Sequence, residues 1–140
     1  MITIGEWEYI TKGSGIAILA VGSMVKKCQN ILNNNSMRNI TLINARFIKP
    51  LDIKMLNALQ KNHKYIFTFE EGSEIGGFGS NILSYYSKKN SKLKVFIKGI
   101  EDNFIEHGTR SELLEITGLD EKGILSYIEN TINSYEQENK

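Results

Sequence analysis

The chain has 140 residues, a length that fits one domain with a single substantial core. Hydrophobic residues make up 41% and charged residues 24%, and the net charge is +1. This balance gives no electrostatic reason to expect nucleic acid or an anionic membrane surface as a partner. No apolar run approaches the ~20 residues that span a bilayer, and the amino terminus lacks a signal-peptide pattern. We therefore expect a cytoplasmic protein without a membrane partner.

The first half of the chain alternates short apolar runs with segments of helical period. A possible edge strand covers residues 7–10, and buried strands are predicted at 16–21 and 40–45. The first helix is marked by Met24, Cys28, Ile31 and Leu32, and the second by Ile53, Leu56 and Leu59, with Asp52 as N-cap. Cys28 is the single cysteine, which excludes an internal disulfide, and its neighbours indicate a buried structural thiol.

The second half repeats the pattern. Strands are predicted at 65–69 and 93–97, and the helix between them is marked by Phe78, Ile82, Leu83 and Tyr86. A capping box at residues 109–112 starts a short helix that Gly118 ends. The last helix begins near Asp120 and carries Leu125, Ile128, Ile132 and Tyr135 on one face. Residues 136–140 are polar, and we expect this tail to fray.

These elements predict a three-layer α/β/α sandwich around a mainly parallel sheet of four to five strands, in a single domain over residues 1–135. All strand-to-helix loops of a parallel sheet emerge at one edge. In this chain they are residues 22–23, 46–49, 70–79 and 99–108. Open α/β sheets meet ligands or partners at this edge. The basic run Lys88, Lys89, Lys92 and Lys94 lies elsewhere, and we interpret it as a solvated loop.

The most unusual loop is the glycine-rich stretch 70–80, EEGSEIGGFGS. A phosphate cradle is one interpretation, but the glycine spacing fits no phosphate-binding motif and three glutamates would repel an anion. We favour the alternative, in which the glycines allow a tight turn and Phe78 anchors the next helix to the sheet.

No residue set in the sequence predicts a self-contained active site. Glu70 and Glu71 are adjacent on a strand, so they point apart, and we expect one of them to pair with a base such as Arg46. His63 follows a helix, where an interaction with the helix end suffices. His107 lies on the loop edge and is the better functional candidate, but the two histidines have no metal-site spacing. We expect no catalytic, cofactor-binding or metal-binding residues.

Three segments carry a family resemblance. They are residues 44–52 (NARFIKPLD), residues 67–80 with their EEG and GGFGS motifs, and residues 102–120 with DNFIEHG, a Leu-Leu pair and GLD. The chain from about Gly5 to Ile132 resembles the carboxy-terminal domain of the 1-deoxy-D-xylulose-5-phosphate synthases, in the transketolase superfamily. The first two segments are shared loosely with transketolases and with 2-oxo-acid dehydrogenase beta subunits.

The resemblance implies a much longer enzyme that joins pyruvate and glyceraldehyde 3-phosphate, with release of carbon dioxide, in isoprenoid precursor synthesis. It uses thiamine diphosphate and Mg²⁺ between two preceding domains. The family's Gly-Asp-Gly cofactor motif does not occur in this chain, so we expect no cofactor here. The resemblance implies a structural domain that packs against the preceding domains and against a second copy in a homodimer. The candidate interface residues are Arg46, Phe47, Glu71, Phe78 and His107.

Two other interpretations remain open. The chain could belong to a transketolase or to a 2-oxo-acid dehydrogenase beta subunit. It could also be a stand-alone small-molecule binding module of flavodoxin-like build, which would need an anion site at Ser23 or at Gly79 and Ser80.

Overall fold

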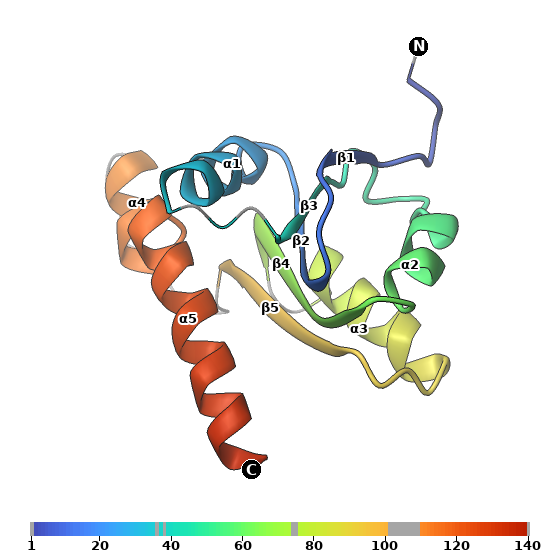
Figure 1. The fold of residues 1–140 in the computed structure, drawn as a ribbon. Helices are drawn as coiled ribbons and strands as arrows, with labels where there is room; N and C mark the ends of the chain where they lie inside the picture. The colour runs from blue at the N-terminus through green and yellow to red at the C-terminus, as the bar shows by residue number, and fades with distance from the viewer. Residues whose placement is uncertain (1, 36, 38, 74–75, 101–109, 140) are drawn as a thin grey trace.

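The computed structural model describes residues 2–35, 37, 39–73, 76–100 and 110–139. Strands and helices alternate along most of the chain (Figure 1). In order they are β1 Glu8–Thr11, β2 Gly15–Ala20, α1 Met24–Asn34, β3 Thr41–Asn44, α2 Ile53–Leu59, β4 His63–Ser73, α3 Phe78–Lys88, β5 Lys94–Ile100, α4 Arg110–Thr117 and α5 Glu121–Glu138.

The strands form one five-stranded sheet in the order β1-β3-β2-β4-β5. β2, β3, β4 and β5 run parallel, and β1 joins the edge antiparallel to β3. Helices α1, α4 and α5 cover one face of the sheet and α2 and α3 cover the other (Figure 1). The predicted α/β/α sandwich with a mainly parallel sheet is therefore confirmed.

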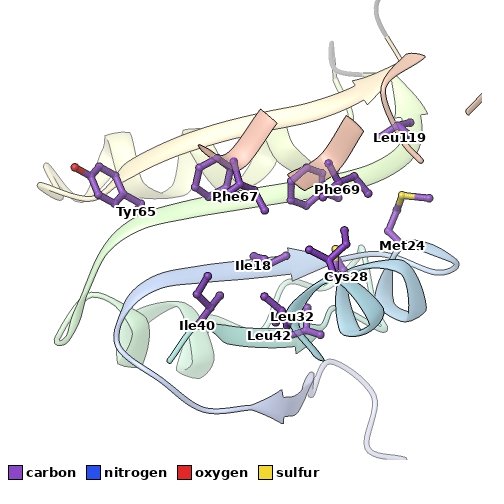
Figure 2. Packing of buried hydrophobic residues seen from close by; sticks show 14 of the residues in the cluster. Ile18, Met24, Cys28, Leu32, Ile40, Leu42, Tyr65, Phe67, Phe69 and Leu119 are labelled. Atoms are coloured by element: carbon purple, nitrogen blue, oxygen red, sulfur yellow. The ribbon is translucent and has the colours of Figure 1, made fainter. Parts of the chain in front are cut away.

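The sheet is apolar on both faces because both are covered by helices. Toward α1 and α5, the rings of Tyr65, Phe67 and Phe69 line β4 and belong to the same buried cluster as the α1 side chains of Met24 and Cys28 (Figure 2). Ile66, which lies between Tyr65 and Phe67, belongs to the cluster on the opposite face with side chains of α2 and α3. This alternation along β4 follows the two-residue period of a strand.

Helix ends follow the predicted signals. Asp52 caps α2 by accepting the Met55 amide at 2.9 Å, and Asp120 caps α5 by accepting the Gly123 amide at 3.0 Å. Gly118, at φ +76°, lies directly after α4, where a left-handed residue ends a helix without a Cβ penalty. The capping box at residues 109–112 begins outside the described residues.

Two helical residues were assigned to the wrong face. Ile53 is 44% exposed and Leu83 is 43% exposed. The buried stripe of α2 is formed by Met55, Leu56 and Leu59. In α3 the helix turns Leu83 away from the stripe that contains Ile82, because neighbouring residues differ by about 100°.

One boundary also differs from expectation. Part of the predicted third loop is strand, because β4 continues to Ser73, where it pairs with Ile100 of a longer β5. Helix α5 continues to Glu138, into the polar tail, and the fraying of this tail remains a prediction. The tail is attached to the sheet through Tyr65, whose hydroxyl donates to Glu136 at 3.0 Å.

Candidate functional site at the carboxyl edge of the sheet

The loops after β2, β3 and β4 meet at one end of the sheet, which we call the carboxyl edge. Backbone hydrogen bonds join these loops to the neighbouring strands: the Val21 amide donates to the Phe69 carbonyl at 3.1 Å, and the Ala45 amide donates to the Ala20 carbonyl at 2.9 Å. The parallel strands thereby hold Ser23, Arg46 and Glu71 at one end of the sheet, as predicted from the shared direction of the strands.

Arg46 and Phe47 are held in place by the amino-terminal segment. The Arg46 guanidinium forms an ion pair with Glu8 of β1 at 3.0 Å, where the two side chains are 24% and 46% exposed. The Trp7 indole N–H donates to the Phe47 carbonyl at 2.9 Å. The predicted partner of Arg46, either Glu70 or Glu71 near the end of β4, was wrong. The antiparallel strand β1 places Glu8 beside the end of β3, opposite Asn44.

Glu70 is buried, with 4% of its surface exposed. It caps helix α3, although it lies eight residues before Phe78, the first residue of that helix. Its carboxylate accepts the amide of Phe78 at 3.2 Å and the amide of Gly79 at 2.8 Å. A carboxylate at this position satisfies two free amides and complements the positive end of the helix dipole. These are the donors that a bound phosphate would need, so Glu70 takes the place of the anion in the cradle interpretation, which the sequence disfavoured.

Gly79 explains how α3 comes so close to the sheet. A Cβ atom at this position would lie 2.5 Å from the Thr68 hydroxyl oxygen and 2.6 Å from a methyl carbon of Ile97. Only glycine fits this contact without movement of the strands. The interpretation of the glycine-rich stretch as a tight helix approach is thus supported by the geometry.

Glu71 lies on the other side of the strand from Glu70, as the alternation of strand residues predicted. Its carboxylate accepts a hydrogen bond from the hydroxyl of Ser23, which precedes α1. This bond links the loop after β2 to the end of β4, the point where the order of the parallel strands reverses. Ligands of open α/β sheets bind at such a point. In this chain the hydrogen bond from Ser23 to Glu71 crosses that point.

Phe78 does not belong to the surface. Its side chain is 1% exposed and packs edge-on against Trp7, with ring centroids 5.6 Å apart. Phe78 therefore anchors α3, as one interpretation of the sequence proposed, and its side chain cannot form part of a docking surface. His107, the fifth predicted interface residue, lies outside the described residues.

His63 and Cys28 lie away from the carboxyl edge. His63 Nδ1 is 3.0 Å from the Leu59 carbonyl at the end of α2, as predicted, and Nε2 is 2.8 Å from the Thr41 hydroxyl. Burial lowers the pKa of His63 below its usual 6.5, although the hydrogen bond to Leu59 acts in the opposite direction. Burial raises the pKa of the Cys28 thiol to about 12, which suits an unreactive structural cysteine.

Sequence reasoning missed Trp7, Glu8 and the second role of Asp52. The carboxylate of Asp52 caps α2 and also accepts the Trp7 amide at 2.8 Å. Trp7 is the only tryptophan of the chain, and a single large aromatic residue before an edge strand was a usable signal.

The described residues do not fit a diphosphate cofactor with its cation. The amides at the start of α3 are engaged by Glu70, and the Ser23 hydroxyl is engaged by Glu71. Over the ranges that the structure describes, no three acidic, histidine or cysteine side chains converge as metal ligands do. Within the same ranges no helix is both long enough and apolar enough to cross a membrane.

The family model described as "Transketolase, C-terminal domain" matches residues 5–124. The 1-deoxy-D-xylulose-5-phosphate synthase of Clostridium tetani is 41% identical over 126 residues, which cover 89% of this chain and 20% of that enzyme. The synthase of Pseudoalteromonas translucida is 36% identical over 133 residues, covering 95% of this chain and 21% of its own length. The chain thus spans about a fifth of the length of these relatives.

Two solved structures share the fold. A chain of a split-gene transketolase, solved as an inactive beta4 tetramer, has a TM-score of 0.82 at 24% identity and covers 92% of this chain and 43% of its own. A transketolase from Campylobacter jejuni has a TM-score of 0.66 at 15% identity, covering 90% of this chain and 18% of its own. At these identities the likeness concerns the fold alone.

Proposed function

Because the chain belongs to the transketolase C-terminal domain family, we propose that it is the carboxy-terminal domain of a 1-deoxy-D-xylulose-5-phosphate synthase. The observation that carries this proposal is the identity of 36–41% to such synthases over most of the chain. The complete enzyme would join pyruvate and glyceraldehyde 3-phosphate with release of carbon dioxide, using thiamine diphosphate and Mg²⁺ held by its other domains. The bond-breaking steps belong to those domains.

The role of this domain is structural. Its carboxyl edge contains the polar groups that α/β proteins often use for ligands, but Glu70 and Glu71 engage them internally. A site whose donors already have partners within the protein must break those bonds before it can bind an anion. This favours a docking role over a binding role for the edge.

The docking surface that we propose lies on the loop after β3. Arg46, Phe47 and Glu71 are half-buried, and the neighbouring Ile48 is 44% exposed. An apolar side chain beside a partly exposed ion pair is typical of an interface rim. The proposed partners are the preceding domains of the same enzyme and a second copy in a homodimer. His107 remains a predicted member of this surface.

Arg46→Glu in the complete enzyme tests the docking surface. Loss of a rim charge pair costs roughly 1 kcal/mol, so we expect the assembly constant to weaken about fivefold, measured by analytical ultracentrifugation. The substitution also breaks the pair with Glu8 inside the domain. The double variant Glu8→Arg with Arg46→Glu restores that internal pair with reversed polarity.

If docking uses Arg46, assembly stays weak in the double variant although the stability of the domain recovers. Recovery of both would assign Arg46 a purely internal role and exclude it from the interface. Unchanged assembly in both variants would reject the proposed surface. The coding sequence upstream of the chain separately distinguishes a synthase from a transketolase or a dehydrogenase beta subunit, since it encodes different amino-terminal domains.

The flavodoxin-like alternative needs free donors at Ser23 or at Gly79. The Ser23 hydroxyl donates to Glu71 and the Gly79 amide donates to Glu70, so both candidate anion positions already face a carboxylate. Thermal unfolding in the presence of flavins and nucleotides checks this. A ligand at 100 times its dissociation constant would stabilise the fold by about 2.7 kcal/mol.

A further inference from the structure

The charges of the chain are distributed unevenly. Residues 53–69 and 75–100 contain eight lysines and no acidic residue, although the whole chain has 17 basic and 16 acidic residues. The described parts of these segments form α2, α3, β5 and most of β4. A net charge of +1 therefore conceals a basic region, and such asymmetry is informative about anionic partners.

The basic region surrounds a cavity at the end of the sheet opposite the carboxyl edge. We call this end the amino edge; here α2 ends and β4 begins, and α3 ends and β5 begins. The cavity has a volume of about 390 Å³ and no acidic residue lines it. Its polar walls include His63, Lys64, Lys89, Asn90, Ser91 and Lys92. The fold thus brings Lys64 beside the basic run that the sequence showed at residues 88–94.

Two lysines of this cavity contact aromatic rings: Lys64 Nζ lies 5.2 Å from the centre of the Tyr65 ring, and Lys89 Nζ lies 5.7 Å from the centre of the Tyr85 ring. Lys64, Lys89 and Lys92 form no ion pair with a carboxylate among the residues that the structure describes, although the hydrogen bond with Tyr65 and, more weakly, the charge of Glu136 raise the pKa of Lys64. The ends of α2 and α3 favour cations through their helix dipoles, which accounts for a base in the last turn. Lys64 and Lys92 lie beyond those turns, so the dipoles do not account for them.

The walls of the cavity are held by hydrogen bonds. The His63 ring is fixed between Leu59 and Thr41. In the turn after α3, the Ser91 amide donates to the Tyr86 carbonyl at 3.1 Å, and the Ser91 hydroxyl oxygen accepts the Leu93 amide at 3.2 Å. The Ser91 hydroxyl can in turn donate to a bound group. Fixed donors lose little conformational entropy when they bind an anion.

We propose that this cavity, the amino-edge pocket, binds a small anion with at least two negative charges, of the class of inorganic phosphate, pyrophosphate or a phosphate ester. Lysine ammonium groups bind phosphate as point charges, and three lysines line this cavity. A compact anion fits better than a long polymer, because the lysines surround one cavity and a polymer needs a basic stripe. The inference does not depend on the proposed function.

Titration with inorganic pyrophosphate tests the pocket, using isothermal calorimetry and amide chemical shifts in nuclear magnetic resonance spectra. We expect saturable binding with shifts centred on Asn90 and Ser91. The double variant Lys89→Ala with Lys92→Ala should weaken binding about tenfold or more, since each charged contact contributes. The matched control, Lys26→Ala with Lys54→Ala, removes two lysines outside the pocket and should stay within about twofold of the wild type.

Failure of the wild-type chain to bind pyrophosphate would overturn the proposal. Equal losses in the pocket variant and its control would also overturn it, because the attraction would then be diffuse. Binding of heparin without binding of pyrophosphate would show a polyanion surface instead of a pocket. If the double variant does not fold, Lys64→Gln provides the same comparison at one position, with the same expected direction.

Discussion

The two edges of the sheet handle charge in opposite ways. At the carboxyl edge, Glu8 is paired with Arg46, and Glu70 and Glu71 accept hydrogen bonds from neighbouring loops. At the amino edge, Lys64, Lys89 and Lys92 line an open cavity and form no ion pair with a carboxylate among the described residues, although the charge of Glu136 acts on Lys64. The comparison teaches that the edge where α/β proteins usually bind ligands is here closed by the protein's own side chains. The lysines that form no ion pair with a described carboxylate lie at the opposite, amino edge.

Gly79→Ala tests how tightly the carboxyl edge is built. The new methyl group would meet Thr68 and Ile97 at 2.5 and 2.6 Å, so α3 must move away from the sheet. We expect a loss of about 3 kcal/mol in the free energy of unfolding, measured with urea. Gly76→Ala is the control. Its Cβ has open space but its φ is +73°, so strain should cost about 1 kcal/mol. Equal losses would contradict a close helix approach.

The substitutions Glu70→Gln and Glu71→Gln compare how much these two adjacent glutamates contribute to stability. The amide group of glutamine presents a donor toward the amides of Phe78 and Gly79, so one of them loses its acceptor. We expect a loss of about 2 kcal/mol, seen as a lower urea midpoint. Glu71→Gln should cost less than about 0.5 kcal/mol, because its bond to Ser23 is exposed to solvent. The reverse order of the two losses would refute the capping role of Glu70.

The protonation of His63 should make the stability of the chain depend on pH. Its pKa is lowered in the folded chain, mainly by burial, so the folded state binds fewer protons than the unfolded state just below pH 6.5. Its contribution to stability should be fully present above pH 6.5 and decline as the pH falls toward the lowered pKa. Urea unfolding at pH 7.5 and pH 5 should show a smaller loss for His63→Gln than for the wild type. Equal losses would exclude this titration.

The smallest effect is expected at Lys92. If the amino edge carries unneutralised charge, Lys92→Gln relieves repulsion and raises stability slightly, by at most about 0.5 kcal/mol at low salt. Near 1 M salt the Debye length is about 3 Å, so the gain should disappear. Thermal unfolding at the two salt concentrations measures it. A loss of stability at low salt would indicate an anionic partner for Lys92 within the chain.

Much of the fold was predictable because its signals are local. Buried strands appear as apolar runs, Asp52 appears as a cap, the last helix was expected to begin near Asp120, and Gly118 marks a helix end. The errors at Ile53 and Leu83 occurred at the margins of the apolar faces of their helices, where periodicity does not decide burial. The length of β4 depended on its pairing with β5, which is a contact between distant segments.

The site was less predictable than the fold, because it depends on contacts between segments that are distant in the sequence. The partner of Arg46 is determined by an antiparallel edge strand, whose position the sequence did not specify. The sequence suggested that Glu70 argues against an anion at α3, but it did not reveal that Glu70 takes the anion's place. The basic cavity combines Lys64 with residues 89–92, and only the fold shows that these segments meet.

We propose that the described residues of this chain contain no cofactor site and that other domains of the complete enzyme hold the cofactor. Calorimetric titration of the chain with thiamine diphosphate in the presence of Mg²⁺ tests it most directly, with pyruvate and glyceraldehyde 3-phosphate added afterwards to detect turnover. We predict no saturable heat attributable to the thiamine moiety beyond that of pyrophosphate alone, and no product. Micromolar binding of the cofactor at a site other than the amino-edge pocket, or any turnover by the chain, would contradict the account.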